Sequence, residues 1–249
     1  MTTVLACTWH PLGEGPHLQR LLPTLLSEYA HIVIAVRPGG LEHIDLDFGP
    51  NVTLFEMAKR GHGRYLALER SLEFAASHVH YADLDVILFW VDHHPEEWLR
   101  TLTTIRTTDA LVIGRTERAF ETCPQAIQQT ERLINTVFSE KLGREMDFGL
   151  GTRGYSGKAV EVILESSKAG HWGDAEWPLL VYRAGLKVAF VRVDGVPWLP
   201  SNLCYADTTE DERTQLARVY DEDVRHWRRR VQVAQAIIGE GLGVSRIFT

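Results

Sequence analysis

The alternation of short, β-branched apolar runs with amphipathic stretches constrains the fold of this chain more than any other feature. TVLACTW (3–9) and HIVIAV (31–36) are typical of buried strands, and HLQRLLPTLLSEYA (17–30) between them has a helical pattern. Strand and helix alternation predicts a mostly parallel sheet with helices packed on both faces. The same reading predicts further strands in NVTLFEM, DALVIG and KVAFVRV, and helices in GRYLALERSLEFAASH, PEEWLRTLTTIRTT, TERLINTVFSEKLG and SGKAVEVILESSKA.

The chain divides into a sheet-containing part and a helical tail. The predicted strands end before residue 200, so we expect one catalytic domain over residues 1–200. Residues 208–242 carry apolar side chains at helical spacing, which predicts one amphipathic helix or two. Thr208 or Thr209 is the expected start of this helical segment, and Gly239 its expected stop. We expect this extension, residues 201–249, to pack on the catalytic domain or on a second subunit as a homodimer.

Composition excludes several classes of protein. With 249 residues, 45% hydrophobic and 24% charged, the chain falls among ordinary soluble globular proteins. The net charge of -7 gives no basic footprint for nucleic acid. Cys7, Cys123 and Cys204 lie far apart and outside any metal-binding spacing, which predicts free thiols in a reducing compartment. No segment approaches the ~18 apolar residues of a transmembrane span, so we expect a cytoplasmic protein.

Two carboxylates stand beside an apolar run in HVHYADLDVILFW, residues 78–90. If Asp83 and Asp85 lie at a strand end, residues i and i+2 share one face, and the two charges repel each other. A divalent cation that prefers oxygen ligands, Mg²⁺ or Mn²⁺, would remove that repulsion. Ligands of open α/β sheets bind outside the carboxyl ends of the strands, where this pair is expected. The alternative is a solvated acidic turn.

The order of features from residue 61 resembles family 2 glycosyltransferases of the GT-A fold. GHGRYLALERSLEFAASHVHYADLDVILFWVDHHPEEWLRTLTTIRTTDALVIGRT is similar to the middle of those enzymes, with a Gly-containing loop, an Asp-x-Asp and a Pro-Glu-Glu helix start. FGLGTRGYSGKAVEVIL and GDAEWPLLVYRAGLKVAFVRVDG look like their acceptor-side loop and acidic segment. The resemblance implies a Rossmann-type three-layer sandwich. It also implies metal-dependent, inverting transfer of a sugar from a nucleotide-sugar donor to a hydroxyl acceptor.

The resemblance assigns roles to four acidic residues. It implies that Asp85 binds the metal directly and that Asp83 contacts the ribose or the metal. Asp174 matches the position that acts as general base in inverting members. Such a base is needed because an acceptor hydroxyl is a weak nucleophile unless a carboxylate takes its proton. Glu176 would support the site or bind the acceptor. The alternative for Asp174 and Glu176 is an ordinary acidic helix N-terminus, which the helix dipole favours.

Glycines and arginines near these acids are candidate donor-binding residues. Gly61, Gly63 and Arg64 could bring backbone and a cation close to a diphosphate, or could form a plain loop before a helix. Arg115 could face phosphate or acceptor with its fork of donors, or could pair with Glu117 or Glu121 at the surface. Arg153 is expected at the acceptor side or as a structural loop residue.

The chain departs from the family pattern in its N-terminal third. Family members place carboxylates after the first and second strands to hold the nucleobase and ribose, and here these places carry TWHPLGEG and VRPGG. Glu14, Asp45 or Asp47 could substitute for them. This departure supports one alternative, a GT-A-like protein that binds nucleotide or sugar without catalysis. Another is a sugar nucleotidyltransferase, whose usual glycine-rich loop with Arg and Lys is only partly matched by HPLGEGPHLQR.

Overall fold

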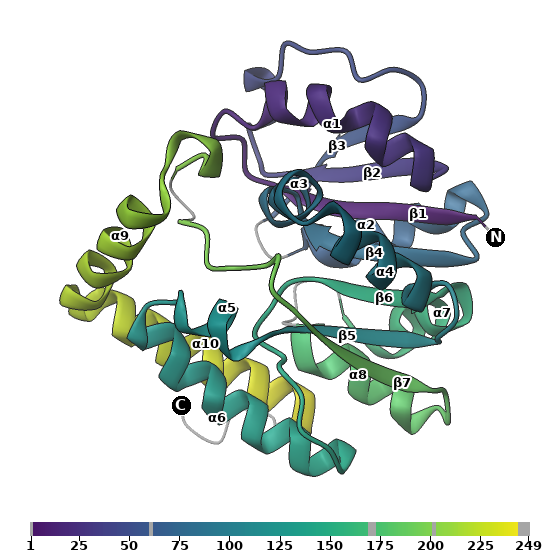
Figure 1. The fold of residues 1–249 in the computed structure, drawn as a ribbon. Helices are drawn as coiled ribbons and strands as arrows, with labels where there is room; N and C mark the ends of the chain where they lie inside the picture. Colours follow the sequence, from purple (N-terminus) through teal and green to yellow (C-terminus); the bar gives the residue numbers. More distant parts are fainter. Residues whose placement is uncertain (1, 60–61, 169–172, 201–202, 244–249) are drawn as a thin grey trace.

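A seven-stranded mixed sheet forms the centre of the molecule (Figure 1). The computed structural model describes residues 2–59, 62–168, 173–200 and 203–243. The strand order is β3-β2-β1-β4-β6-β5-β7. The strands are β1 (Thr3–Trp9), β2 (His31–Val36), β3 (Val52–Glu56), β4 (His78–Asp83), β5 (Ala110–Arg115), β6 (Arg153–Ser156) and β7 (Val188–Val193). The strands predicted from the apolar runs are therefore confirmed, whereas β6 was not predicted.

The short strand β6 runs against the direction of its neighbours. It pairs antiparallel with β4 on one side and with β5 on the other, and the remaining pairings in the described sheet are parallel. Six strands therefore end at the same edge of the sheet, and β6 begins there. The predicted sheet, mostly parallel, is confirmed.

Helices cover both faces of the sheet and make three layers. Alternate residues of the strands point to opposite sides: Leu5 packs with the helices of one face and Val4 with those of the other. The first face carries α1 (Gly15–Glu28), α3 (Leu84–His93) and α4 (Pro95–Ile105). The second face carries α2 (Gly63–Ser71), α6 (Gln125–Leu142), α7 (Gly157–Ser166), α8 (Gly173–Arg183) and α10 (Val224–Leu242). Shorter elements are α5 (Glu117–Glu121), η1 (Leu41–His43), η2 (Leu72–Phe74) and η3 (Tyr205–Asp207), and α9 (Glu210–Glu222) precedes α10.

The expectation that Asp83 and Asp85 share a strand face is wrong. Strand β4 ends at Asp83, and α3 begins at the next residue, so Asp85 lies in the first helical turn. The apolar run after Asp83 buries Leu84, Ile87 and Leu88, a spacing of three and four that suits a helix. The two carboxylates are therefore presented by a strand-to-helix turn at the carboxyl edge of the sheet.

The C-terminal segment forms two helices, and they are tied to the rest of the molecule. Thr209 caps α9 in a capping box with Glu212, as the predicted start requires, but α10 continues past Gly239 to Leu242. Its buried Val233 and Ile237 share the core of the second face, and Figure 1 shows α10 beside α6. Asp221 of α9 accepts hydrogen bonds from the first backbone N–H groups of α6. Among the described residues, no helix is long and apolar enough to cross a membrane.

Candidate active site at the carboxyl edge

The candidate site lies where the strand order reverses direction. Strand β1 leads to β2 on one side, while its other neighbour β4 arrives from β3 by a crossover, so β1 and β4 flank a topological switch point. Ligands of open α/β sheets bind at such points. Asp83 pairs in register with Thr8, and the chain after β1 carries the buried Glu14. The sheet topology therefore places acidic side chains at the position where a ligand is expected.

Asp83 is held in one orientation by its neighbours. Its Oδ1 accepts hydrogen bonds from Thr8 Oγ1 at 2.5 Å and from the Tyr81 hydroxyl at 2.8 Å. Its Oδ2 accepts from the Arg64 guanidinium at 3.2 Å. The Asp83 carboxylate, 31% exposed, is thus fixed by protein contacts and still reached by solvent.

Arg64 joins three segments that are distant in sequence. From the start of α2 it pairs with Asp83 at the end of β4 and with Asp174 in the first turn of α8. Gly63 lets the start of α2 pack closely on β1, because a Cβ there would lie 2.5 Å from the Met57 methyl carbon and 3.0 Å from Thr8 Cγ2. The structure therefore brings together three of the residues singled out from the sequence, Arg64, Asp83 and Asp174.

Asp85 differs from Asp83 in its electrostatics. Burial, together with the negative charges of Asp83 and Glu14, raises the pKa of the Asp85 carboxyl to about 7. Asp83 has Arg64 as a counter-ion, whereas the charges acting on Asp85 are those of other acids. Asp85 is consequently the carboxylate of this pair that would gain most from a bound cation.

The donor set at this edge suits a hard divalent cation. Among the described residues, no group of three or more His, Cys, Asp or Glu side chains is arranged to hold a metal by itself. Two carboxylates that leave the other positions to water and substrate phosphates are the usual arrangement for Mg²⁺. The chemistry of Asp83 and Asp85 therefore fits Mg²⁺ or Mn²⁺, and a structural zinc site does not fit.

A loop between α6 and β6 closes over the Asp83 and Arg64 contact. A Cβ at Gly151 would lie 2.6 Å from Asp83 Oδ2 and 2.8 Å from an Arg64 nitrogen. The buried Arg153 holds this loop by donating to the carbonyls of Phe148 and Thr152, and it also donates to the carbonyl of Asp174. These contacts favour the structural interpretation of Arg153, which positions the loop and the start of α8.

Arg115 is enclosed in a buried ion-pair network. Its guanidinium pairs with Asp147 at 2.8 Å and with Glu131 at 2.5 Å, and Arg230 of α10 pairs with the same Glu131 at 2.7 Å. Of the two alternatives for Arg115, the surface pairing with Glu117 or Glu121 is wrong, because the side chain is buried, and contact with phosphate or acceptor stays a prediction. Glu131 and Asp147 were not singled out from the sequence, which carries no local signal for contacts over 16 and 32 residues.

Glu176, a further predicted residue, stands apart from this cluster. The Glu176 carboxylate accepts a hydrogen bond from Ser167, in the connection between α7 and α8, and Ser167 also accepts one from Trp177. Glu176 therefore stabilises the start of α8 while Asp174 faces Arg64. Gly61 lies outside the described residues.

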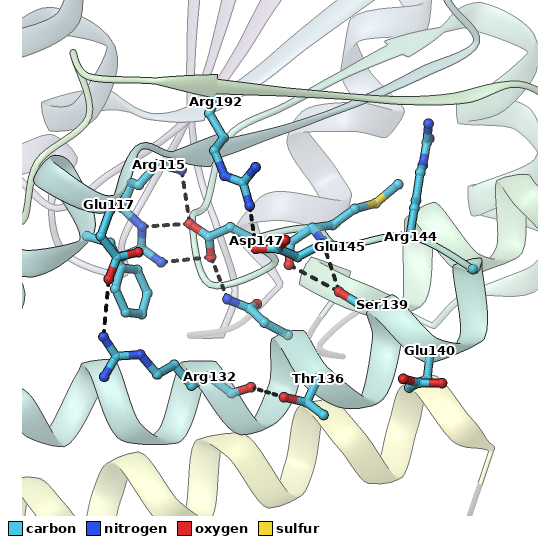
Figure 2. Close-up of a pocket in the computed structure, with 14 residues that line it drawn as sticks. Arg115, Glu117, Arg132, Thr136, Ser139, Glu140, Arg144, Glu145, Asp147 and Arg192 are labelled. Carbon is cyan, nitrogen blue, oxygen red and sulfur yellow. Dashed lines mark hydrogen bonds and ion pairs between the residues drawn. The ribbon is translucent and has the colours of Figure 1, made fainter.

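A cavity of about 650 Å³ lies away from these acids, between α6, β5 and β7 (Figure 2). Of its lining arginines, Arg192 pairs with Glu145 at 2.6 Å and Arg132 with Glu117 at 3.4 Å, whereas Arg144 donates to the Val188 carbonyl. The lining as a whole carries four arginines and four acids. None of Asp83, Asp85, Arg64 and Asp174 lines it. Such exposed ion pairs contribute little to stability. A lining with equal numbers of acidic and basic side chains favours neither an anionic nor a cationic ligand. The carboxyl edge of β4 is therefore the better candidate site.

Comparisons with known proteins identify the fold alone. No protein-family model and no curated protein matches the sequence. Glucosyl-3-phosphoglycerate synthase from Mycobacterium tuberculosis superposes with a TM-score of 0.57 at 13% identity, covering 99% of this chain and 82% of that one. 4-Diphosphocytidyl-2C-methyl-D-erythritol synthase from Anaerococcus prevotii superposes with a TM-score of 0.51 at 13% identity, covering 89% and 99%.

A more distant match was solved with a metal. Rv0371c from M. tuberculosis H37Rv, in complex with manganese, has a TM-score of 0.48 at 12% identity and covers 87% of this chain and 98% of its own. A similarity this low does not bear on metal binding here. The fold is GT-A-like, as predicted, and it is shared by glycosyltransferases and nucleotidyltransferases. Membership of glycosyltransferase family 2 is not confirmed.

Proposed function

Proceeding from a GT-A-like fold, we propose that this protein is a metal-dependent glycosyltransferase that moves a sugar from a nucleotide-sugar donor to a hydroxyl acceptor, with inversion. One observation carries the proposal. Arg64 links Asp83, at the carboxyl end of β4, to Asp174, at the start of α8, at the switch point of the sheet. In this proposal Asp83 and Asp85 hold the metal, and Asp174, which Arg64 links to Asp83, is the carboxylate that accepts a proton.

Each residue of the cluster has a chemical task in sugar transfer. Asp85 and Asp83 would hold Mn²⁺ or Mg²⁺, which stabilises negative charge on a leaving diphosphate. Arg64 can donate to the same phosphates, because a guanidinium offers several hydrogen bonds to oxyanions. Asp174 takes the proton of the acceptor hydroxyl as the new bond forms.

The ion pair between Arg64 and Asp174 connects donor binding to the ability of the Asp174 carboxylate to accept a proton. Arg64 occupies an oxygen of Asp174, whose side chain is only 9% exposed. Donor phosphates would compete with Asp174 for that guanidinium. Binding of the donor therefore favours an Asp174 carboxylate that can receive a proton.

The proposal is tested by nucleoside diphosphate release. Purified protein is supplied with Mn²⁺ and with each common nucleotide-sugar in turn, and the released diphosphate is measured. We expect release that stops when a chelator removes the metal and that Asp85→Ala abolishes. Asp92→Asn is the matched control, because Asp92 lies on the same helix α3 and pairs with the exposed Arg20. Full release by Asp85→Ala would refute the metal role.

The same assay separates the alternative functions. Pyrophosphate release from a nucleoside triphosphate and a sugar phosphate would indicate a nucleotidyltransferase, the activity class of one of the structural matches. Tight nucleotide binding without any turnover would indicate a protein that binds its ligand without catalysis.

A further inference from the structure

The carboxyl ends of β1, β2 and β3 bring a second polar group to the same edge of the sheet. Val36 pairs in register with Trp9 on one side and with Glu56 on the other. His10, Arg37 and Glu56 are therefore neighbours across three adjacent strands. Strands lie about 4.8 Å apart, so this group is roughly 10 Å along the edge from Asp83 on β4. That separation is comparable to the distance from the diphosphate to the base of a nucleotide.

A tight turn fixes the backbone at Arg37. Residues Arg37, Pro38, Gly39 and Gly40 form a turn closed by the Gly40 N–H donating to the Arg37 carbonyl at 2.9 Å. Proline at the second position and a φ of +71° at Gly39 are the signature of a type II turn. The Gly39 N–H donates to Glu56 Oε1 at 2.6 Å, which ties the turn to the end of β3.

The side chains of this group offer donors and an acceptor side by side. Arg37 Nη1 donates to His10 Nε2 at 3.2 Å. Arg37 Nε is buried and has no hydrogen-bond partner among the described residues, so the two terminal nitrogens are the donors that a ligand can reach. The exposed Glu56 uses one carboxylate oxygen on Gly39. A cationic fork and a carboxylate thus lie at the ends of two adjacent strands, β2 and β3.

Guanine is the base whose edges match this pair. Its O6 and N7 accept hydrogen bonds from an arginine fork in a bidentate contact, and its N1–H and N2–H₂ donate to a carboxylate. Adenine presents an unprotonated N1 to the carboxylate, and uracil has one N–H between two carbonyl oxygens. Cytosine offers the carboxylate its N4 amino group alone, whereas guanine offers two parallel N–H donors. We propose that Arg37 and Glu56 select guanine, so that the donor is a guanosine diphosphate sugar. This inference rests on the proposed function, since it deepens the description of the same site.

Binding of the bare nucleotides tests the base preference. GDP, UDP and ADP are each titrated into the protein by calorimetry with Mn²⁺ present. We expect GDP to bind about tenfold more tightly than UDP or ADP, the discrimination typical of one bidentate base contact. Arg37→Lys keeps the charge but loses the fork, so it should remove most of the GDP preference while UDP binding changes little. Arg100→Lys is the control, because Arg100 is exposed on α4 and pairs with Glu96 at 3.8 Å.

The outcomes distinguish the two proposals. Equal or tighter binding of UDP or ADP would overturn the guanine inference, and if turnover were also seen, the proposed function would stand. Equal weakening of all three nucleotides by Arg37→Lys would also overturn it, because Arg37 would then contact phosphate. Should that variant fail to fold, the comparison of the three nucleotides with the wild-type protein still decides. Absence of binding by every nucleoside diphosphate would remove both proposals.

Discussion

A buried histidine on β4, the strand that carries Asp83, should make folding stability depend on pH. His80 is fully buried in a directional chain of hydrogen bonds. Trp98 Nε1 donates to the Tyr29 hydroxyl at 2.9 Å, and Thr152 donates to the Tyr81 carbonyl at 3.0 Å. His80 fits between them as a neutral ring, with Nδ1 accepting from Tyr29 at 2.6 Å and Nε2–H donating to Thr152 at 3.0 Å.

Burial lowers the pKa of His80 from its ordinary value of 6.5 to about 3. Between pH 6.5 and pH 3 the imidazole of His80 is protonated in the unfolded chain and neutral in the folded protein. The free energy of unfolding therefore decreases as the pH falls through this range. From pH 7.5 to pH 5 the unfolded imidazole takes up nearly a whole proton and the folded one almost none. The expected loss of stability from His80 alone is about 2 kcal/mol over this range.

The contribution of His80 is separated from those of other groups by subtracting the stability change of His80→Gln from that of wild type. His31 and His78 also have pKa values lowered by burial, and the raised pKa of Asp85 acts in the opposite direction. Urea unfolding at pH 7.5 and pH 5 is therefore compared between wild type, His80→Gln and the exposed-residue control His43→Gln. Wild type and the control should each lose about 2 kcal/mol more than His80→Gln. Equal losses in all three, or an NMR titration showing His80 protonated at pH 5, would refute the reasoning.

Two further predictions concern the loop and the network near the site. Gly151→Ala should lower diphosphate release by about tenfold or more with little change in melting temperature, because its Cβ would displace the carboxylate of Asp83; unchanged release would show that the loop is not part of the site. Glu131→Gln should lower the free energy of unfolding by about 3 kcal/mol or more, since it leaves Arg115 and Arg230 without their shared buried counter-ion. A shift of less than about 1 kcal/mol in urea unfolding would contradict that account.

Strands and helices with a strong local pattern could be predicted from the sequence. The fully buried run of β2 and the Pro95 start of α4 were both located correctly, because burial and capping act on neighbouring residues. Strand β6 was missed because its four residues, RGYS, carry no apolar run. Its place in the sheet depends on pairing with β4 and β5, which are distant in sequence.

The candidate site was predictable only in part, for the same reason. Asp83 and Asp85 were noticed because two acids beside an apolar run are visible locally, although Asp85, which lies in the first turn of α3, was expected on the same strand as Asp83. The contact of Arg64 with Asp174 spans 110 residues, and no local pattern indicates it. The inward direction of Arg115 depends on Asp147, which a loop brings back over the end of β5.

The reversed direction of β6 has a consequence for how this scaffold can change. Because β6 begins at the edge where its neighbours end, the segment that precedes it reaches the site, and the turn that follows it lies at the far edge. Insertions after Ser156 would lengthen a remote connection, whereas even one added residue between Gly143 and Arg153 would shift the backbone against Asp83. If the proposed function holds, natural variation in acceptor preference should therefore concentrate in the segment entering β6.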